Sequence, residues 1–300
     1  MECTTTSLCG TLTAIVTPFS ASTSDIDYGS LENLIEFQIR SKVDGIVVCG
    51  STGEAATLND QEYKDVIKFT REKVKGRVLL VGGVGTSSTS RAIEMAKYIN
   101  LTGLDAVMVV APPYNKPPQS GIIAHFSEVK KNITIPLIAY NVPGRSGVNI
   151  LPKTFQKLAE QKTIVGVKEA CGSVDQILDL LYAVRTRVAV LSGDDSLTSS
   201  VMTAGGRGVI SVVANFAPKL IKAITDAALR GDFAAASNAQ FDALPFCRAA
   251  FAETNPIPAK TALKLMGIIK SDAMRLPLVP AEPSTKALLE ELLKELKTGE

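Results

Sequence analysis

The sequence contains one histidine, no tryptophan and no C-x-x-C pair. The single histidine, His125, excludes metal sites built from several histidines and leaves one candidate for a Ser-His-Asp arrangement. Because His125 lies within a helical pattern, we expect a helix-surface or packing residue and not a catalytic base. Cysteines are odd in number and widely spaced: Cys3, Cys9, Cys49, Cys171 and Cys247. This usage favours reduced thiols over a disulfide framework or zinc site, and predicts a cytoplasmic protein.

An excess of one charge and long apolar runs are also lacking. The chain has 32 basic and 30 acidic residues, a formal net charge of +2, so its charge predicts no nucleic-acid or membrane-surface partner. No stretch approaches the ~18 apolar residues of a membrane span. The first residues lack a basic region followed by an apolar run, so we expect no targeting segment.

What the sequence does contain is a repeated alternation of apolar, β-branched runs with segments of helical period. Eight runs have the length of strands: Leu12–Thr17, Gly45–Cys49, Val78–Gly82, Ala106–Ala111, Pro136–Asn141, Thr163–Lys168, Val188–Ser192 and Gly208–Val212. Their continuous hydrophobicity is typical of a parallel sheet covered on both faces, with the intervening helices as crossovers. Eight such units predict an α/β fold, a (β/α)8 TIM barrel. A doubly wound open sheet is the alternative.

The strand signal stops beyond about residue 225. Three helical patterns follow, near Asp232–Ala250, Pro258–Lys270 and Ser284–Lys297, and the last carries leucines on one stripe. We therefore expect a catalytic barrel over residues 1–225 and a C-terminal extension of three helices over residues 226–300. The extension would pack on the barrel or on a neighbouring subunit.

Polar residues follow several of the predicted strands. Ser51 and Thr52 come after the second strand, Tyr114 after the fourth, and Tyr140 ends the fifth, shortly before Arg145. Because the loops that follow the strands of a parallel barrel share one rim, these side chains can converge. Each also has a structural explanation: a tight loop, a stiff proline-rich segment, or a core tyrosine whose hydroxyl bonds to the backbone.

Lys168 ends the sixth predicted strand. An ammonium group at the end of a buried strand is costly to desolvate, so its pKa should fall toward that of a free amine, which can attack a ketone. Taken alone, the segment favours a lysine whose stem is buried and whose head reaches water. The residues at the other strand ends reverse that preference.

These segments together resemble the pyruvate-dependent class I aldolases of the N-acetylneuraminate lyase superfamily, and among them the dihydrodipicolinate synthase family. The resemblance covers nearly the whole chain and rests on the order and spacing of seven segments, each weakly specific alone. They are Thr17-Pro18-Phe19, the run from Gly50 to Leu58, Tyr140-Asn141-Val142-Pro143, the run from Gly166 to Ala170, Ser192-Gly193-Asp194-Asp195, Gly208-Val209-Ile210-Ser211, and the run from Asn255 to Lys260.

The resemblance implies that Lys168 forms a Schiff base with pyruvate, whose enamine attacks L-aspartate-4-semialdehyde. The amino group of the second substrate then closes the ring to give 4-hydroxy-tetrahydrodipicolinate, in lysine and diaminopimelate biosynthesis. In the family, two tyrosines and a hydroxyl residue transfer the protons. These residues match Tyr140, Tyr114 and Ser51 in this sequence. Tyr114 is expected to come from a neighbouring subunit.

By the same resemblance, Thr52 and the backbone N–H groups around it hold the pyruvate carboxylate. Arg145 receives the carboxylate of the second substrate. Gly193 and Ile210 match positions that line the pocket near the Schiff base. The family implies no metal or organic cofactor, and a homo-oligomer that is a tetramer built as a dimer of dimers.

Two departures from the family bear on substrate and regulation. Most synthases carry threonine where Ser51 stands, and the Ser-Thr form is common in the sialic-acid lyases of the superfamily. Arg145 favours the synthase, because a cation there suits a small carboxylated aldehyde better than a sugar chain.

The second departure concerns feedback inhibition by lysine. The positions that bind lysine in inhibited relatives read Ala55, Asp60, Tyr63, Ser87, Arg91 and Pro113. Arg91 replaces an expected glutamate and should repel the lysine ammonium, and Pro113 removes an aromatic wall. We expect weak or absent inhibition.

Three other hypotheses remain open from sequence. The first is a dinucleotide-binding turn, because the run from Gly82 to Ser87 follows a strand and precedes a helix. This run does not complete the G-x-G-x-x-G pattern of such turns. Glycines at 205, 206 and 208 suit a phosphate site, as in phosphosugar barrels, or close packing alone. A barrel that has lost catalysis and acts as a sensor is a different class, against which the presence of Lys168, Tyr140 and Tyr114 argues.

Overall fold

Eight parallel strands form a closed barrel in the computed structural model, which describes residues 3–298. Each strand pairs with the next, and β8 pairs with β1 to close the sheet. The strands are β1 (Gly10–Ala14), β2 (Gly45–Val48), β3 (Leu79–Val84), β4 (Ala106–Val110), β5 (Leu137–Asn141), β6 (Gly166–Glu169), β7 (Ala189–Ser192) and β8 (Gly208–Ser211). The predicted (β/α)8 barrel is confirmed, and the open sheet is excluded.

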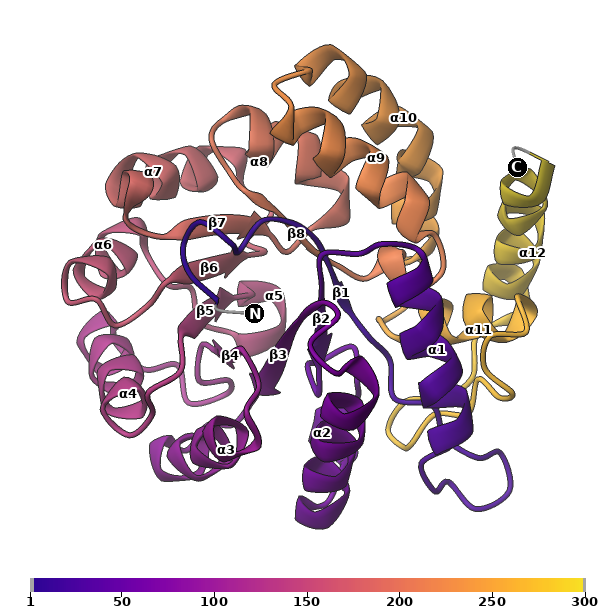
Figure 1. Cartoon of the computed structure of the whole chain (residues 1–300), viewed down its shortest axis with the longest axis horizontal. Coiled ribbons are helices and arrows are strands. Elements are labelled where there is room, and N and C mark those ends of the chain that lie inside the picture. Colours follow the sequence, from indigo (N-terminus) through magenta and orange to yellow (C-terminus); the bar gives the residue numbers. More distant parts are fainter. Residues whose placement is uncertain (1–2, 299–300) are drawn as a thin grey trace.

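Helices surround the strands as a ring (Figure 1). One follows each strand: α1 (Tyr28–Arg40), α2 (Asp60–Val74), α3 (Thr89–Thr102), α4 (Gln119–Lys131), α6 (Pro152–Glu160), α7 (Val174–Val184), α8 (Thr198–Thr203) and α9 (Pro218–Leu229). Shorter elements lie in the connections: α5 (Pro143–Ser146), η1 (Ala55–Thr57), η2 (Arg185–Arg187), η3 (Asp195–Leu197) and η4 (Val213–Asn215). In the part of the chain that the structure describes, no helix is both long and apolar enough to cross a membrane.

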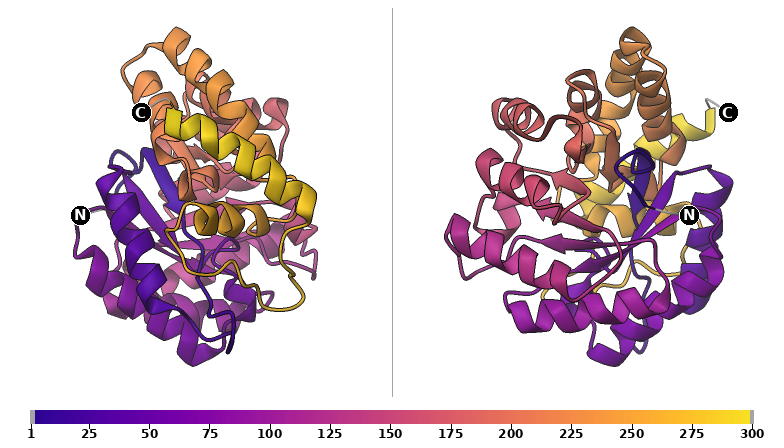
Figure 2. Two further views of the ribbon diagram at one scale, coloured as in Figure 1. Left: turned by 90° about the vertical axis from the view of Figure 1, so that its right-hand side faces the viewer. Right: turned by 60° about the vertical axis from the view of Figure 1, so that its left-hand side comes forward.

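Three further helices form the C-terminal extension: α10 (Phe233–Ala249), α11 (Ile257–Leu265) and α12 (Pro283–Thr298). α10 packs against α8 and α9, and α12 packs against α10 and α11 (Figure 2). Residue 225, where the sequence predicts the barrel to end, lies inside α9, which continues to Leu229. α11 is shorter than predicted because the chain leaves the helix at Met266 and enters a left-handed conformation at Gly267.

Two apolar layers position the strands. The larger lies between the barrel and its helices, and the smaller fills the barrel interior with residues that include Leu12, Met108 and Ile210. Cys3 and Leu8, before β1, belong to the interior layer and are buried. Because side chains alternate between the two faces of a strand, each strand contributes to both layers, which accounts for the continuous hydrophobicity of the runs.

The single histidine is a packing residue, as expected. His125 is buried on α4, and its Nδ1 lies 3.0 Å from the hydroxyl of Thr89 on α3. Burial lowers the pKa of His125 to about 4, so the ring stays neutral at physiological pH.

Candidate active site

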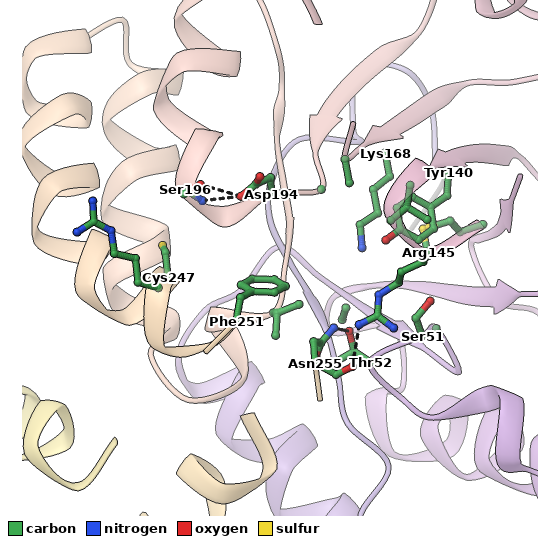
Figure 3. A pocket seen from close by; sticks show the side chains of 18 residues that line it. Ser51, Thr52, Tyr140, Arg145, Lys168, Asp194, Ser196, Cys247, Phe251 and Asn255 are labelled. Atoms are coloured by element: carbon green, nitrogen blue, oxygen red, sulfur yellow. Dashed lines mark hydrogen bonds between the residues drawn. The ribbon is translucent and has the colours of Figure 1, made fainter. Parts of the chain in front are cut away.

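A cavity of about 500 Å³ opens where the strands of the barrel end (Figure 3). Residues at the ends of β1, β5 and β6 and in the loops after β2, β7 and β8 line it, as barrel geometry predicts. The lining residues are Ala14, Gly50, Ser51, Thr52, Met108, Tyr140, Val142, Arg145, Lys168, Ala170, Gly193, Asp194, Ser196, Val212, Cys247, Arg248, Phe251 and Asn255. Six of the eight residues predicted for the site are therefore brought together here.

Lys168 is buried on β6, with 4% of its surface exposed, and pairs in register with Tyr140 on β5. Its Nζ lies 4.4 Å from the centre of the Tyr140 ring. Burial lowers the pKa of Lys168 to about 8, helped by the cation of Arg145 and opposed by the carboxylate of Asp195. At pH 7 about one-tenth of the amine is then uncharged and nucleophilic. The predicted direction of the pKa shift is confirmed.

Tyr140 titrates far above neutral pH. Burial raises the pKa of its phenol to about 12, with Glu169 adding to the effect and Arg145 opposing it. The hydroxyl is therefore protonated under all ordinary conditions and can donate a hydrogen bond or a proton to a group in the cavity.

The turn after β2 presents Ser51 and Thr52. The amides of Gly53 and Glu54 donate back to Gly50 and Ser51 at 3.1 Å each, which closes the turn. The amides of Ser51 and Thr52 have no acceptor among the residues that the structure describes. These two N–H groups and two hydroxyls form a set of donors suited to a carboxylate.

Arg145 and Asn255 join this turn to the C-terminal extension. Nη2 of Arg145 donates to the carbonyl oxygen of Asn255 at 2.7 Å, and Nδ2 of Asn255 donates to Oγ1 of Thr52 at 3.0 Å. Figure 3 shows Arg145, Asn255, Thr52 and Ser51 grouped on one side of the cavity, beside Lys168 and Tyr140. A cation with further N–H donors thus lies next to the uncharged donors of the turn.

Gly193 is required by the stem of Lys168. A Cβ atom at Gly193 would lie 2.8 Å from Cβ of Ala170 and 3.1 Å from Cε of Lys168, so a side chain would push the lysine aside. Ile210 does not line the cavity; it is fully buried on β8, in the same interior layer as Tyr140. Ile210 can therefore act on the site only through packing.

Tyr114 does not line the cavity. Its side chain is 89% exposed, although its backbone is held in a left-handed conformation, φ 71°, by a 3.0 Å bond from its amide to the carbonyl oxygen of Ser146. Nδ2 of Asn115 also bonds to the carbonyl oxygen of Ser87 at 3.1 Å. A fixed loop thus presents an aromatic side chain to the outside.

Sequence reasoning assigned no role to three polar residues at or beside the site. Asn255 comes from the loop before α11, and nothing in its neighbourhood predicts contact with Thr52. Asp195 is fully buried and accepts from the hydroxyl of Ser211 and, at 2.9 Å, from the amide of Val212. Glu169 is buried behind Lys168; strand alternation was the signal, because a lysine pointing inward places the next residue on the outer face.

Metal-binding clusters of three or more His, Cys, Asp or Glu residues are absent from residues 3–298.

The model of the dihydrodipicolinate synthetase family matches residues 7–296. The 4-hydroxy-tetrahydrodipicolinate synthase of Geobacter sulfurreducens is 45% identical over 286 residues, which cover 95% of this chain and 98% of that protein.

Solved structures are similar over the same extent. A monomeric dihydrodipicolinate synthase variant is 39% identical, with a TM-score of 0.94 over 97% of both chains. The chloride-inhibited dihydrodipicolinate synthase of Acinetobacter baumannii, solved in complex with pyruvate, is 38% identical, with a TM-score of 0.93 over 96% of this chain and 98% of that one.

Proposed function

The chain belongs to the dihydrodipicolinate synthetase family and has the activity of a 4-hydroxy-tetrahydrodipicolinate synthase, and we propose that Lys168 carries this activity as a Schiff base with pyruvate. The position of Lys168 supports the proposal most directly. Its amine is buried at the wall of the cavity, has its pKa lowered to about 8, and lies against Tyr140. A relative solved with pyruvate supports the choice of keto acid.

In the first half of the reaction, the lone pair of Lys168 Nζ attacks the ketone carbon of pyruvate. The carbinolamine loses its hydroxyl as water and leaves a protonated imine. The cationic nitrogen withdraws electrons from the neighbouring methyl group, which loses a proton and becomes an enamine. The buried setting of Lys168 favours this sequence, because the attacking amine has to be uncharged.

In the second half, the enamine carbon attacks the aldehyde of L-aspartate-4-semialdehyde and forms the new carbon–carbon bond. The amino group of that substrate then attacks the imine carbon, closes the ring and releases Lys168. Each pyruvate and semialdehyde pair yields one 4-hydroxy-tetrahydrodipicolinate and the one water lost in imine formation.

Proton transfers in these steps are assigned to Tyr140, Tyr114 and Ser51. The protonated phenol of Tyr140 is next to Lys168 and can serve the carbinolamine and the imine. Ser51 lines the same cavity. Tyr114 would enter the cavity of a second subunit, a role that its exposed side chain and fixed backbone suit.

Substrate carboxylates are assigned to the N–H and hydroxyl donors of the turn after β2 and to Arg145. Thr52 and the unpaired amides of the turn would hold the carboxylate of pyruvate. Arg145 would hold that of the semialdehyde, since one of its nitrogens is engaged with Asn255 and the others remain for a ligand. Gly193 would leave space for the imine, and Ile210 would act on it only through packing in the layer that contains Tyr140.

A homotetramer, built as a dimer of dimers, is the assembly we propose. Val174, Leu178 and Tyr182 lie on one stripe of α7 and are 48%, 48% and 72% exposed, an unusual face for a surface helix. Tyr114 is a second exposed aromatic. Two such surfaces support two kinds of contact between subunits. We also place the enzyme in the cytoplasm, which suits its five free cysteines.

Borohydride reduction in the presence of pyruvate tests the Schiff base. We expect a stable adduct that maps to the peptide of Lys168 and is absent from the peptide of Lys260, which is also deeply buried. Adduct formation should be lost in Lys168→Ala. A chain that gains no mass would refute the proposal. Assays with aspartate semialdehyde and with N-acetylneuraminate, run side by side, then separate the synthase from the lyase to which Ser51 points.

A further inference from the structure

Glu169 is a buried acid that has no basic ion-pair partner among the residues that the structure describes. It follows Lys168 on β6, and because Lys168 points into the cavity, Glu169 points outward, toward the helices. Only 1% of its surface is exposed. Within residues 3–298, no lysine or arginine forms an ion pair with it. A buried carboxyl kept without a cation calls for an explanation in its hydrogen bonds.

Hydrogen bonds from two neighbouring segments converge on Glu169. Nδ2 of Asn141 donates to both carboxylate oxygens, at 2.9 and 3.1 Å, and the amide of Cys171 donates to Oε1 at 2.8 Å. Nδ2 of Asn141 also bonds Oδ1 of Asn149 at 2.8 Å. Asn149 and Gln176 are joined by bonds of 2.7 and 3.1 Å. The network therefore ties β5, β6, the loop before α6 and the start of α7 together.

The register of β5 and β6 places this network directly behind Tyr140 and Lys168. Tyr140 pairs with Lys168, and Asn141 pairs with Glu169 one residue further along. The bond between Asn141 and Glu169 thus spans the same two strands, immediately behind the two side chains assigned to the chemistry. A shift of one strand against the other would change the distance between the Tyr140 ring and Lys168 Nζ, now 4.4 Å.

We propose that Glu169 is a positioning residue whose ionised carboxylate, through Asn141, holds the ends of β5 and β6 in the register that places Tyr140 against Lys168. The inference rests on the proposed roles of those two residues. It deepens them, because it adds a group outside the cavity on which the proton transfers depend.

The ionised form is the one that fits. The side chain of Asn141 and the amide of Cys171 both donate N–H groups to the carboxylate. If the carboxyl were protonated, its own O–H would face one of these donors and one hydrogen bond would be lost. Burial raises the pKa of Glu169 to about 7, against the hydrogen bonds that lower it. The titratable neighbours, Cys171 and Tyr140, have pKa values raised to about 11 and about 12, so neither changes charge near neutral pH. The hydrogen bonds that join Glu169 to Asn141 and Cys171 are therefore intact above about pH 7. They weaken below it, because the carboxylate takes up a proton.

The test is the pH dependence of kcat with both substrates saturating. Each turnover regenerates free Lys168, whose own titration near pH 8 is common to all these variants, so a further decline of kcat below about pH 7 reports another group. We expect that decline in the wild-type enzyme and its absence in Glu169→Gln, which cannot titrate. Glu160→Gln, the same change at an exposed glutamate on α6, should keep the decline. Glu169→Ala, which leaves the donors unpaired, should lower kcat by roughly 10- to 100-fold.

Borohydride trapping with pyruvate separates this inference from the proposed function. If the wild-type enzyme gains no adduct on Lys168, the proposed function fails. If it does and Glu169→Gln keeps the unaltered decline in kcat, the positioning role is refuted. Should Glu169→Gln not fold, Glu169→Asp carries the test: its shorter carboxylate should keep a titrating decline at a lower kcat, and an unchanged kcat would overturn the inference.

Discussion

Lys260 and Glu54 form an ion pair that is withdrawn from solvent, with 0% and 1% of their side chains exposed. Lys260 lies on α11, outside the barrel, and Glu54 ends the turn that presents Ser51 and Thr52. Nζ of Lys260 also donates to the carbonyl oxygen of Ala273 at 2.9 Å. The ion pair thereby holds the C-terminal extension against the turn proposed to bind pyruvate. We therefore expect the extension to be needed for activity.

Breaking this pair from one side should destabilise the protein. Lys260→Met would leave the Glu54 carboxylate buried without its cation, at a cost of about 3–5 kcal/mol, while Glu54→Gln with Lys260→Met removes both charges and should recover most of that loss. Thermal unfolding of the three proteins measures the effect. A single variant as stable as the wild type would show that the pair is not buried in solution.

Gly193→Ala should slow formation of the Schiff base. The added methyl group would meet Cε of Lys168 at 3.1 Å and Cβ of Ala170 at 2.8 Å, so the lysine stem has to move. We expect a fall of roughly 10- to 100-fold in the rate of borohydride-trapped adduct. Gly144→Ala is the matched control, because nothing lies within 4 Å of the Cβ that it adds. Equal rates in the two variants would contradict the steric argument.

The barrel was predictable because its sequence signal is local and repeated eight times. The exact residues at which the strands begin and end were not predictable. Hydrophobicity placed the first strand at Leu12–Thr17, but β1 is Gly10–Ala14. Ile15 and Val16 are buried beyond the strand, where the side chain of Asn215 accepts from the amide of Val16 at 3.1 Å. A buried loop and a buried strand have the same composition, so only the hydrogen-bond partner tells them apart.

The site divides in the same way. Lys168 and Tyr140 lie near the ends of β6 and β5, and Ser51 and Thr52 follow β2. The rule that strand ends share one rim was enough to bring them together. Asn255 was assigned no role, and Ile210, which the family resemblance placed at the pocket, does not line the cavity. Asn255 reaches Thr52 only because the extension folds back over the barrel, and Ile210 packs in the buried barrel interior. Contacts between segments far apart in sequence have no local pattern.

The rate at which pyruvate captures Lys168 should rise with pH and level off above about pH 8. Burial lowers the pKa of Lys168 from its ordinary value of 10.5 to about 8, and only the form that has lost its proton attacks the ketone. Because the pKa is lowered, the reactive form becomes the major one above pH 8 and is depleted below it. Adduct formation under limiting pyruvate, followed from pH 6 to 10 by mass, measures this. A rate that keeps rising toward pH 10.5 would place Lys168 in solvent.

Arg145→Ala should impair the second substrate more than the first. Loss of a hydrogen-bonded ion pair with the semialdehyde carboxylate predicts a rise in its KM on the order of 10- to 100-fold. Arg145→Lys keeps the charge but not the fork of donors, and should fall between Arg145→Ala and the wild type. Initial rates with each substrate varied in turn give both KM values. The assignment fails if the KM of pyruvate carries the larger change.

Lysine should inhibit this enzyme weakly or not at all. At the positions that the family resemblance matches to lysine binding, Arg91 is paired with Asp60, and it also pairs with nearby Glu94, so both acids are already neutralised by a cation of the protein. The hydroxyl of Tyr63 is buried and donates to the carbonyl oxygen of Gly83 at 2.7 Å. An incoming lysine ammonium would meet the charge of Arg91 and find few acceptors.

An activity titration with lysine measures this, and strong inhibition at sub-millimolar concentrations would contradict it. Arg91→Glu removes the repelling cation and leaves Asp60 and Glu94 without their partner. Inhibition should then appear at lower lysine concentrations than in the wild type. Arg187→Glu makes the same charge change in η2, before β7, and should leave the response unaltered. If both variants respond alike, net charge governs the effect and the local pairing of Arg91 does not.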